Sequence, residues 1–420
     1  MNRLILILLA LLPLLASAQA IKVEVKQEAD GSWQLYRGDK PYYVKGAGGT
    51  DHLDMLVEAG GNTVRTWSIA DARKILDEAH SKGLTVLVGM WMGQERQGFD
   101  YSDPWGVEDQ LRRFRDDVRA IKDHPAILAW GVGNECDLFY TDYNVWDAAE
   151  EICAMLHEED PNHPTMVVTA GIDVAEIQMI QERAPSVDIM GFNTYGDVKI
   201  VSRVVDRAGW DGPYMVTEWG TDGHWEVAKT DWGVPIEPTG TEKENNFRDR
   251  YAEFIASDQE QCVGSFCFLW GQKQETTPTW YGMFLEDGTP SARVDAMMDA
   301  WGRPPSNRAP KIESYLFDGK TPYDNVRLSG GDVVNIEAKL SDPEGKPIEV
   351  KWELLPESTD IRSGGDAEAR PEAMPISISG SSKRGYRFKA PKRKGPYRLF
   401  MYVYDDSGRA VSANFPFYIQ

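Results

Sequence analysis

The stretch "ILAWGVGNE", residues Ile127 to Glu135, is an apolar run that stops abruptly on an amide and a carboxylate. A continuous apolar run of this length is typical of a strand that is buried on both faces in a parallel sheet. A buried Asn or Glu costs free energy unless it has a partner. The stretch therefore predicts a parallel strand whose carboxyl end presents polar groups to partners from elsewhere in the chain.

Similar apolar runs alternate with helical patterns as far as Trp301. The other seven runs occupy residues 42–46, 62–67, 84–91, 165–171, 188–195, 214–220 and 263–270. One helical pattern, residues 71–83, begins at Asp71 and ends at Gly83, which are typical boundary residues. Eight strands, each followed by a helix, predict an α/β fold of the (β/α)8 TIM-barrel type. An open, doubly wound sheet is the alternative.

The pattern divides the chain into four parts. Residues 1–18 read as a signal peptide, and residues 19–302 as the barrel, preceded by a hairpin turned at Asp30 and Gly31 that could plug its floor. Residues 303–310 have the composition of a linker. In residues 311–420 the hydrophobic period changes to two, which predicts a small all-β sandwich of immunoglobulin or fibronectin type.

The first segment also predicts where the protein works. It combines Arg3, an apolar stretch from Leu4 to Leu15 and small residues up to Ala18, the features of a signal cleaved on export. The apolar stretch is shorter than the roughly 20 residues of a membrane span. We therefore expect a periplasmic or extracellular protein that is cleaved near Ala18.

The composition limits the classes of partner. The formal net charge is −21, and such a surface repels both nucleic acid and anionic lipid, so neither is expected as a partner. Of the four cysteines, Cys262 directly precedes the predicted strand at 263–270 and Cys267 lies within it, so in one extended segment the two are too far apart to bridge. A Cys136–Cys153 bridge stays open as an alternative to free buried thiols.

Polar and aromatic residues gather where the predicted strands end, which is the catalytic face of a TIM barrel. They are Arg65, Trp67, Trp91, Asn134, Glu135, Asn193, Tyr195, Glu218, Trp219 and Trp270. Two carboxylates in one apolar mouth cannot both ionise normally, because each charge opposes the other. One acid and one anion facing each other are what glycosidic cleavage requires. The alternative is that Glu135 and Glu218 are structural and paired to Arg65.

Three stretches resemble a known superfamily. "DHPAILAWGVGNE" (residues 123–135) is similar to the acid/base segment of clan A glycoside hydrolases, "GPYMVTEWG" (212–220) to their nucleophile segment, and "AGGNTVRTW" (59–67) to their second strand. This superfamily includes the family 2 β-galactosidases and β-glucuronidases and the family 5 glucanases and mannanases. The domains that precede the barrel in family 2 are absent from this pattern.

The resemblance implies a retaining mechanism and a role for each residue. Glu135 would be the acid/base and Glu218 the nucleophile, while Asn134 would donate to the sugar 2-hydroxyl. Arg65 and Tyr195 would orient Glu218, and Trp270 would form the floor under the reacting sugar. We expect the two carboxyl groups to lie about 5–5.5 Å apart, the spacing for a covalent intermediate.

Other chemistries fit the sequence less well. Gly46, Gly48 and Gly49 do not complete a dinucleotide motif, because its third glycine would fall on Asp51. There is no G-x-S-x-G esterase elbow, and the six histidines show no hydrolytic zinc spacing, so no metal or cofactor is expected.

The sequence thus predicts a retaining glycoside hydrolase acting on a polysaccharide or oligosaccharide, most plausibly a β-glucan. β-Mannan hydrolysis, β-glucan transglycosylation and a noncatalytic glycan-binding barrel are the alternatives.

Overall fold

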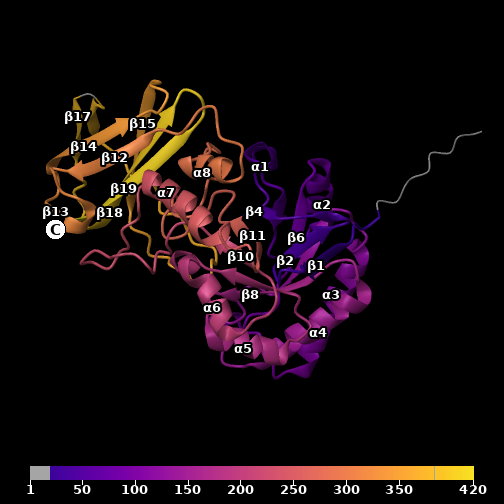
Figure 1. The fold of residues 1–420 in the computed structure, drawn as a ribbon. Helices are drawn as coiled ribbons and strands as arrows, with labels where there is room; N and C mark the ends of the chain where they lie inside the picture. The colour runs from indigo at the N-terminus through magenta and orange to yellow at the C-terminus, as the bar shows by residue number, and fades with distance from the viewer. Residues whose placement is uncertain (1–18, 383) are drawn as a thin grey trace, which may run out of the picture.

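The computed structural model describes residues 19–382 and 384–420, so the predicted signal segment lies outside the described residues. Eight parallel strands form a closed barrel in the order β10-β11-β4-β5-β6-β7-β8-β9 (Figure 1). The strands are β4 (Val44–Gly48), β5 (Thr63–Arg65), β6 (Thr85–Met90), β7 (Ile127–Val132), β8 (Thr165–Ala170), β9 (Ile189–Asn193), β10 (Tyr214–Trp219) and β11 (Cys262–Cys267). The predicted (β/α)8 barrel is confirmed, and the open sheet is excluded because β11 pairs with β4.

Eight α-helices accompany these strands among the described residues. They are α1 (Leu53–Ala59), α2 (Ala72–Ser81), α3 (Pro104–Ile121), α4 (Asn144–Glu159), α5 (Val174–Arg183), α6 (Val201–Ala208), α7 (Gly240–Arg250) and α8 (Ala292–Ala300). Local sequence explains several boundaries: Asp103 caps α3 by accepting from the Trp105 amide, and Thr239 and Glu242 form a capping box at the start of α7.

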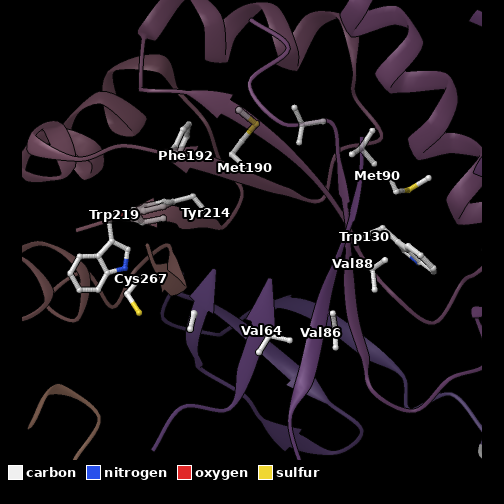
Figure 2. Packing of buried hydrophobic residues seen from close by; sticks show 14 of the residues in the cluster. Val64, Val86, Val88, Met90, Trp130, Met190, Phe192, Tyr214, Trp219 and Cys267 are labelled. Carbon is white, nitrogen blue, oxygen red and sulfur yellow. The ribbon is translucent and has the colours of Figure 1, made fainter. Parts of the chain in front are cut away.

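Barrel strands are mainly apolar because each of their faces packs on a different layer. Val86, Val88 and Met90 of β6 pack outward toward the helices (Figure 2), whereas Leu87 points into the barrel. The N-terminal strands β1 (Val23–Gln27), β2 (Trp33–Arg37) and β3 (Lys40–Pro41) form a separate antiparallel sheet. Val23 and Leu35 of this sheet pack against the inner barrel residues, so it closes the end of the barrel opposite the catalytic face.

The C-terminal part is a sandwich of two four-stranded sheets, β12-β14-β17-β16 and β13-β19-β18-β15. Its strands are β12 (Lys311–Phe317), β13 (Arg327–Leu328), β14 (Val333–Ser341), β15 (Ile348–Pro356), β16 (Ile378–Ser381), β17 (Gly385–Lys389), β18 (Gly395–Asp405) and β19 (Ala410–Ile419). Phe317 and Phe415 stack between the sheets with ring centroids 4.0 Å apart. The predicted sandwich following the barrel is confirmed.

The sandwich packs on the side of the barrel that carries α7 and α8 (Figure 1). Polar contacts join the two parts: Arg409 Nε lies 3.0 Å from Asp295 Oδ1 of α8, and Asn414 Nδ2 donates to Glu237 Oε2 at 2.6 Å. Both acceptors are buried. Because buried polar groups need fixed partners, these contacts hold the sandwich in one orientation on the barrel.

All four cysteines are buried free thiols, so the Cys136–Cys153 bridge left open by the sequence does not form in this structure. Within the part of the chain that the structure describes, none of the helices has the length and apolar character needed to span a bilayer.

Candidate active site

Glu135 and Glu218 line one cavity of about 610 Å³ at the carboxyl ends of the barrel strands. Asn193 connects them: its Nδ2 donates to Glu135 Oε1 at 2.9 Å, and its Oδ1 accepts from Arg65 Nη1 at 3.1 Å. The same Nη1 donates to Glu218 Oε1 at 2.9 Å. The side-chain partners predicted for the polar end of the "ILAWGVGNE" strand are therefore present, and they come from two other strands, β5 and β9.

A turn at the end of β7 presents Asn134 and Glu135 to the cavity. The strand stops at Val132, and Gly133 takes a φ of +72°, where an added Cβ would lie 2.9 Å from Cys136 Sγ. Glu135 itself has a φ of +50°, a left-handed conformation that costs a side-chain-bearing residue roughly 1–2 kcal/mol. A hydrogen bond from its amide to Val168 O, 3.0 Å, fixes this turn. Local strain at this position aims the carboxyl group into the cavity.

Three donors surround the carboxylate of Glu218. Arg65 Nη1 and Trp67 Nε1 donate to Oε1 at 2.9 and 2.8 Å, and the Tyr195 hydroxyl donates to Oε2 at 3.0 Å. Arg65 is buried, so its charge acts on Glu218 with little screening by water. These contacts fix the orientation of the Glu218 carboxylate, and two of them come from Arg65 and Tyr195, the residues expected to orient it.

The surroundings of Glu135, unlike those of Glu218, disfavour a negative charge on the carboxyl group. Burial, and secondly the negative charge of Glu218, raise its pKa from 4.5 to about 7, while the Asn193 hydrogen bond and the Arg65 charge oppose the shift. Repulsion between the two carboxylates was expected to cause this shift, but loss of solvation is the larger cause. Near neutral pH the Glu135 carboxyl group therefore takes its protonated and its ionised form in comparable amounts, so it can give a proton to a ligand or accept one.

Asn134 lies between these groups. Its Oδ1 accepts from Arg65 Nη2 at 2.6 Å and from Asn193 Nδ2 at 3.1 Å. Because both bonds go to the oxygen, the NH2 group is the end that can donate to a ligand. Asn134 lines the cavity, so this geometry suits donation to a sugar hydroxyl.

The aromatic predictions are only partly correct. Trp67 and Trp91 line the cavity, but Trp219 and Trp270 do not. Trp219 follows Glu218 on β10, so it points to the opposite face, where it packs on Phe247 and Tyr251.

Trp270 is also wrong as a sugar platform. The strand β11 ends at Cys267, earlier than predicted, and the chain turns before Trp270, which is fully buried against Phe284 and Trp301. Phe268, directly after the strand, lines the cavity instead. An apolar run does not reveal where its strand ends, and for that reason the sequence placed Trp270 at the end of the strand.

Other cavity residues were not predicted as a site. From the barrel they are Leu138, Phe139, Ala170, Gly171, Thr194, Asp197, His224, Trp225, Glu226, Leu269, Lys273 and Glu275, and from the sandwich Arg362, Ser363, Gly364, Gly365 and Asp366. Burial lowers the pKa of His224 to about 4, so this imidazole is neutral at ordinary pH. Among the described residues no cluster of three or more His, Cys, Asp or Glu side chains is placed to hold a metal ion.

The sequence matches no protein-family model and no curated protein. Its structure, however, is similar to those of several solved glycoside hydrolases. The β-D-glucuronidase of Dictyoglomus thermophilum superposes with a TM-score of 0.51 at 18% identity, over 68% of this chain and 54% of that one. A calcium-binding mutant of Bacteroides uniformis β-glucuronidase 2 superposes with a TM-score of 0.52 at 15% identity, over 95% of this chain and 48% of that one. An uncultured Clostridium β-glucuronidase superposes with a TM-score of 0.54 at 16% identity, over 67% of this chain and 53% of that one.

The chain has the fold of these glycoside hydrolases. This confirms the expected resemblance to the clan A barrel at the level of fold. The match to the Bacteroides uniformis structure covers too much of this chain to be confined to the barrel, so it includes the sandwich. The chain spans about half the length of the structures it matches.

Proposed function

We propose that this protein is a retaining β-glycosidase in which Glu218 is the nucleophile and Glu135 the acid/base. The observation that carries the proposal is the contrast between the two carboxyl groups of one cavity. Glu218 is held as an anion by Arg65, Trp67 and Tyr195, while Glu135 has a pKa of about 7. A strand-end pair with only a structural role needs no such difference.

The proposed reaction has two steps. The Glu218 carboxylate attacks the anomeric carbon, and Glu135 gives its proton to the glycosidic oxygen as that bond breaks. The leaving group departs with the proton, and a glycosyl ester of Glu218 is left. Esterification removes the Glu218 charge, so the pKa of Glu135 falls and its carboxylate can take a proton from water. That water attacks the anomeric carbon and releases Glu218, and the configuration is retained.

For the substrate we propose a neutral β-glucan rather than a uronide. Besides the two catalytic groups, the cavity is lined by four carboxyl side chains: Asp197, Glu226, Glu275 and Asp366. Its two cations already have acidic partners, since Lys273 lies 2.7 Å from Glu275 and Arg362 lies 2.6 Å from Asp360. Asp366 is paired with Arg96, but Asp197 and Glu226 have no ion-pair partner in the part of the chain that the structure describes, so they would repel the carboxylate of a uronic acid but not a neutral sugar. β-Mannan is the first alternative, and transfer to a sugar hydroxyl instead of water is the second.

The assignment is tested with aryl β-glycosides and Glu→Ala variants. Without its nucleophile, Glu218→Ala loses hydrolysis by at least about 10³-fold, and added azide yields the α-glycosyl azide. Glu135→Ala keeps the nucleophile, so azide yields the β-glycosyl azide. The exposed Glu58, away from the cavity, supplies the matched control Glu58→Ala with unchanged rates.

Substrate class is tested with the wild-type enzyme. Gluco-oligosaccharides should be cleaved faster than manno-oligosaccharides, and aryl glucuronides slowest. NMR of the first product should show the β-anomer. Hydrolysis that survives in Glu218→Ala contradicts the mechanism, and preference for the glucuronide contradicts the substrate assignment.

A further inference from the structure

The segment between β15 and β16, residues 357–377, reaches from the sandwich into the catalytic cavity; we refer to it as the sandwich loop. Residues 362–366 of this loop line the cavity together with Glu135 and Glu218. The sandwich is therefore not merely attached to the barrel, because it supplies part of the cavity wall.

Charged contacts fix the sandwich loop on the barrel. Arg96 Nη1 and Nη2 donate to the two carboxylate oxygens of Asp366 at 2.9 and 3.2 Å, a bidentate pair. Lys273 Nζ donates to Gly365 O at 2.7 Å, and the Thr276 amide donates to Glu368 Oε2 at 2.6 Å. The Arg96 side chain is 10% exposed, so its pair with Asp366 is better shielded from water than a surface ion pair.

Two glycines allow the close approach. Gly364 and Gly365 have φ values of +61° and +69°, which side-chain-bearing residues rarely adopt. A Cβ on Gly364 would lie 2.7 Å from Arg96 Nη2 and 2.9 Å from Leu138 Cδ2. A Cβ on Gly365 would lie 2.9 Å from Lys273 Nζ. Residues 364 and 365 of the sandwich loop thus pack so closely against the barrel that no larger residue fits there without displacing a neighbour.

Two of the barrel residues that contact the loop, Arg96 and Leu138, lie near the acid/base. The positive charge of Arg96 acts on Glu135 and lowers its pKa, although less than burial and Glu218 raise it. Leu138, against which Gly364 packs, follows Glu135 by three residues. The hydrogen-bond donors to Glu218, by contrast, are all barrel residues.

We propose that the sandwich loop forms the binding site for the leaving group, with Arg362 as its specificity-determining residue. The general acid protonates the leaving oxygen, so the group beside Glu135 in the complex is the leaving group. Arg362 lines the cavity with its side chain 56% exposed, and only its Nε is engaged by Asp360. Its remaining N–H groups can donate to the hydroxyls of a leaving sugar. This proposal rests on the proposed function.

The test compares two leaving groups of one glycoside. A 2,4-dinitrophenyl β-glucoside needs little proton donation and no site for a leaving sugar, whereas a gluco-oligosaccharide needs both. In Arg362→Ala, kcat/KM for the oligosaccharide should fall about 10- to 100-fold, while kcat for the dinitrophenyl glycoside should change by less than about twofold. The reason is that the second step, which limits kcat with a good leaving group, occurs after the leaving group has departed.

Asp366→Ala tests whether the ion pair between Asp366 and Arg96 positions the sandwich loop. It should produce the same split between the two substrates, because it releases the loop from Arg96. Gly364→Val displaces the tip without changing any charge, so it repeats the test if Asp366→Ala fails to fold. Glu313→Gln is the matched control: it removes an exposed sandwich ion pair with Lys339, away from the cavity, and should leave both substrates unaffected.

Equal losses on both substrates, or no loss on the oligosaccharide, would overturn the leaving-group assignment while leaving the proposed function intact. A wild-type protein that cleaves neither substrate would overturn the proposed function and this assignment with it.

Discussion

The ionised form of Glu135 lowers the free energy of unfolding above neutral pH. Replacing Glu135 by Gln measures the size of this loss. In the folded state burial and Glu218 raise its pKa from 4.5 to about 7. At 1.36 kcal/mol per pKa unit, the charged form is disfavoured in the fold by about 3 kcal/mol. Gln has the same shape as the protonated acid and can still accept the Asn193 bond with its Oε1.

The sign of the pH effect follows from proton binding. Between pH 4.5 and pH 7 the folded state holds the Glu135 proton more tightly than the unfolded state does, so the wild-type free energy of unfolding falls as pH rises through this window. The side chain introduced by Glu135→Gln cannot ionise in either state, so the free energy of unfolding of this variant does not fall for that reason. The stability of the variant relative to wild type should therefore increase by about 2–3 kcal/mol between pH 5 and pH 8.

Urea unfolding at the two pH values measures this difference without any need for a substrate. Glu58→Gln, at an exposed position, serves as the control and should show no comparable change. If the stability curves of wild type and Glu135→Gln run parallel from pH 5 to pH 8, Glu135 is an ordinary carboxylate. The claim that it stores the catalytic proton would then be refuted.

Three further substitutions have definite expected outcomes. Arg65→Lys keeps a charge but loses the fork that holds Glu218 and Asn134, so kcat/KM should fall about 10²-fold, as measured in steady-state assays. Trp270→Phe should lower the free energy of unfolding by about 1–3 kcal/mol and leave KM unchanged, because this indole lies in the core; a raised KM would contradict that placement. Arg398→Met leaves the buried Glu357 without its cation and should cost about 3–5 kcal/mol in denaturant unfolding, whereas a neutral result would show that the pair contributes nothing.

The fold was predictable because the barrel imposes a simple pattern. Strands buried on both faces are mainly apolar, so β7 and its counterparts stand out in the sequence. The catalytic end of such a barrel is also fixed in advance, and for that reason Asn134, Glu135 and Glu218 could be placed in one cavity.

Side-chain direction was harder to predict. Trp219 was assigned to the cavity although it neighbours Glu218 and must point away from it. Trp270 was assigned there because the end of β11 has no polar residue to mark it. The contribution of Asp366 could not be inferred at all, since no periodicity within the sandwich indicates that its loop touches Arg96, which is 270 residues away in the chain.

The closure of the barrel has a consequence for synthesis of the chain. The first barrel strand, β4, gains its second neighbour only when β11 arrives, and Val44 pairs there with Gly264. A ribosome must therefore add more than half of the polypeptide before the cylinder can seal. A product truncated before Cys262 would leave β4 and β10 each with a bare backbone edge, the form of sheet most prone to join other chains into aggregates.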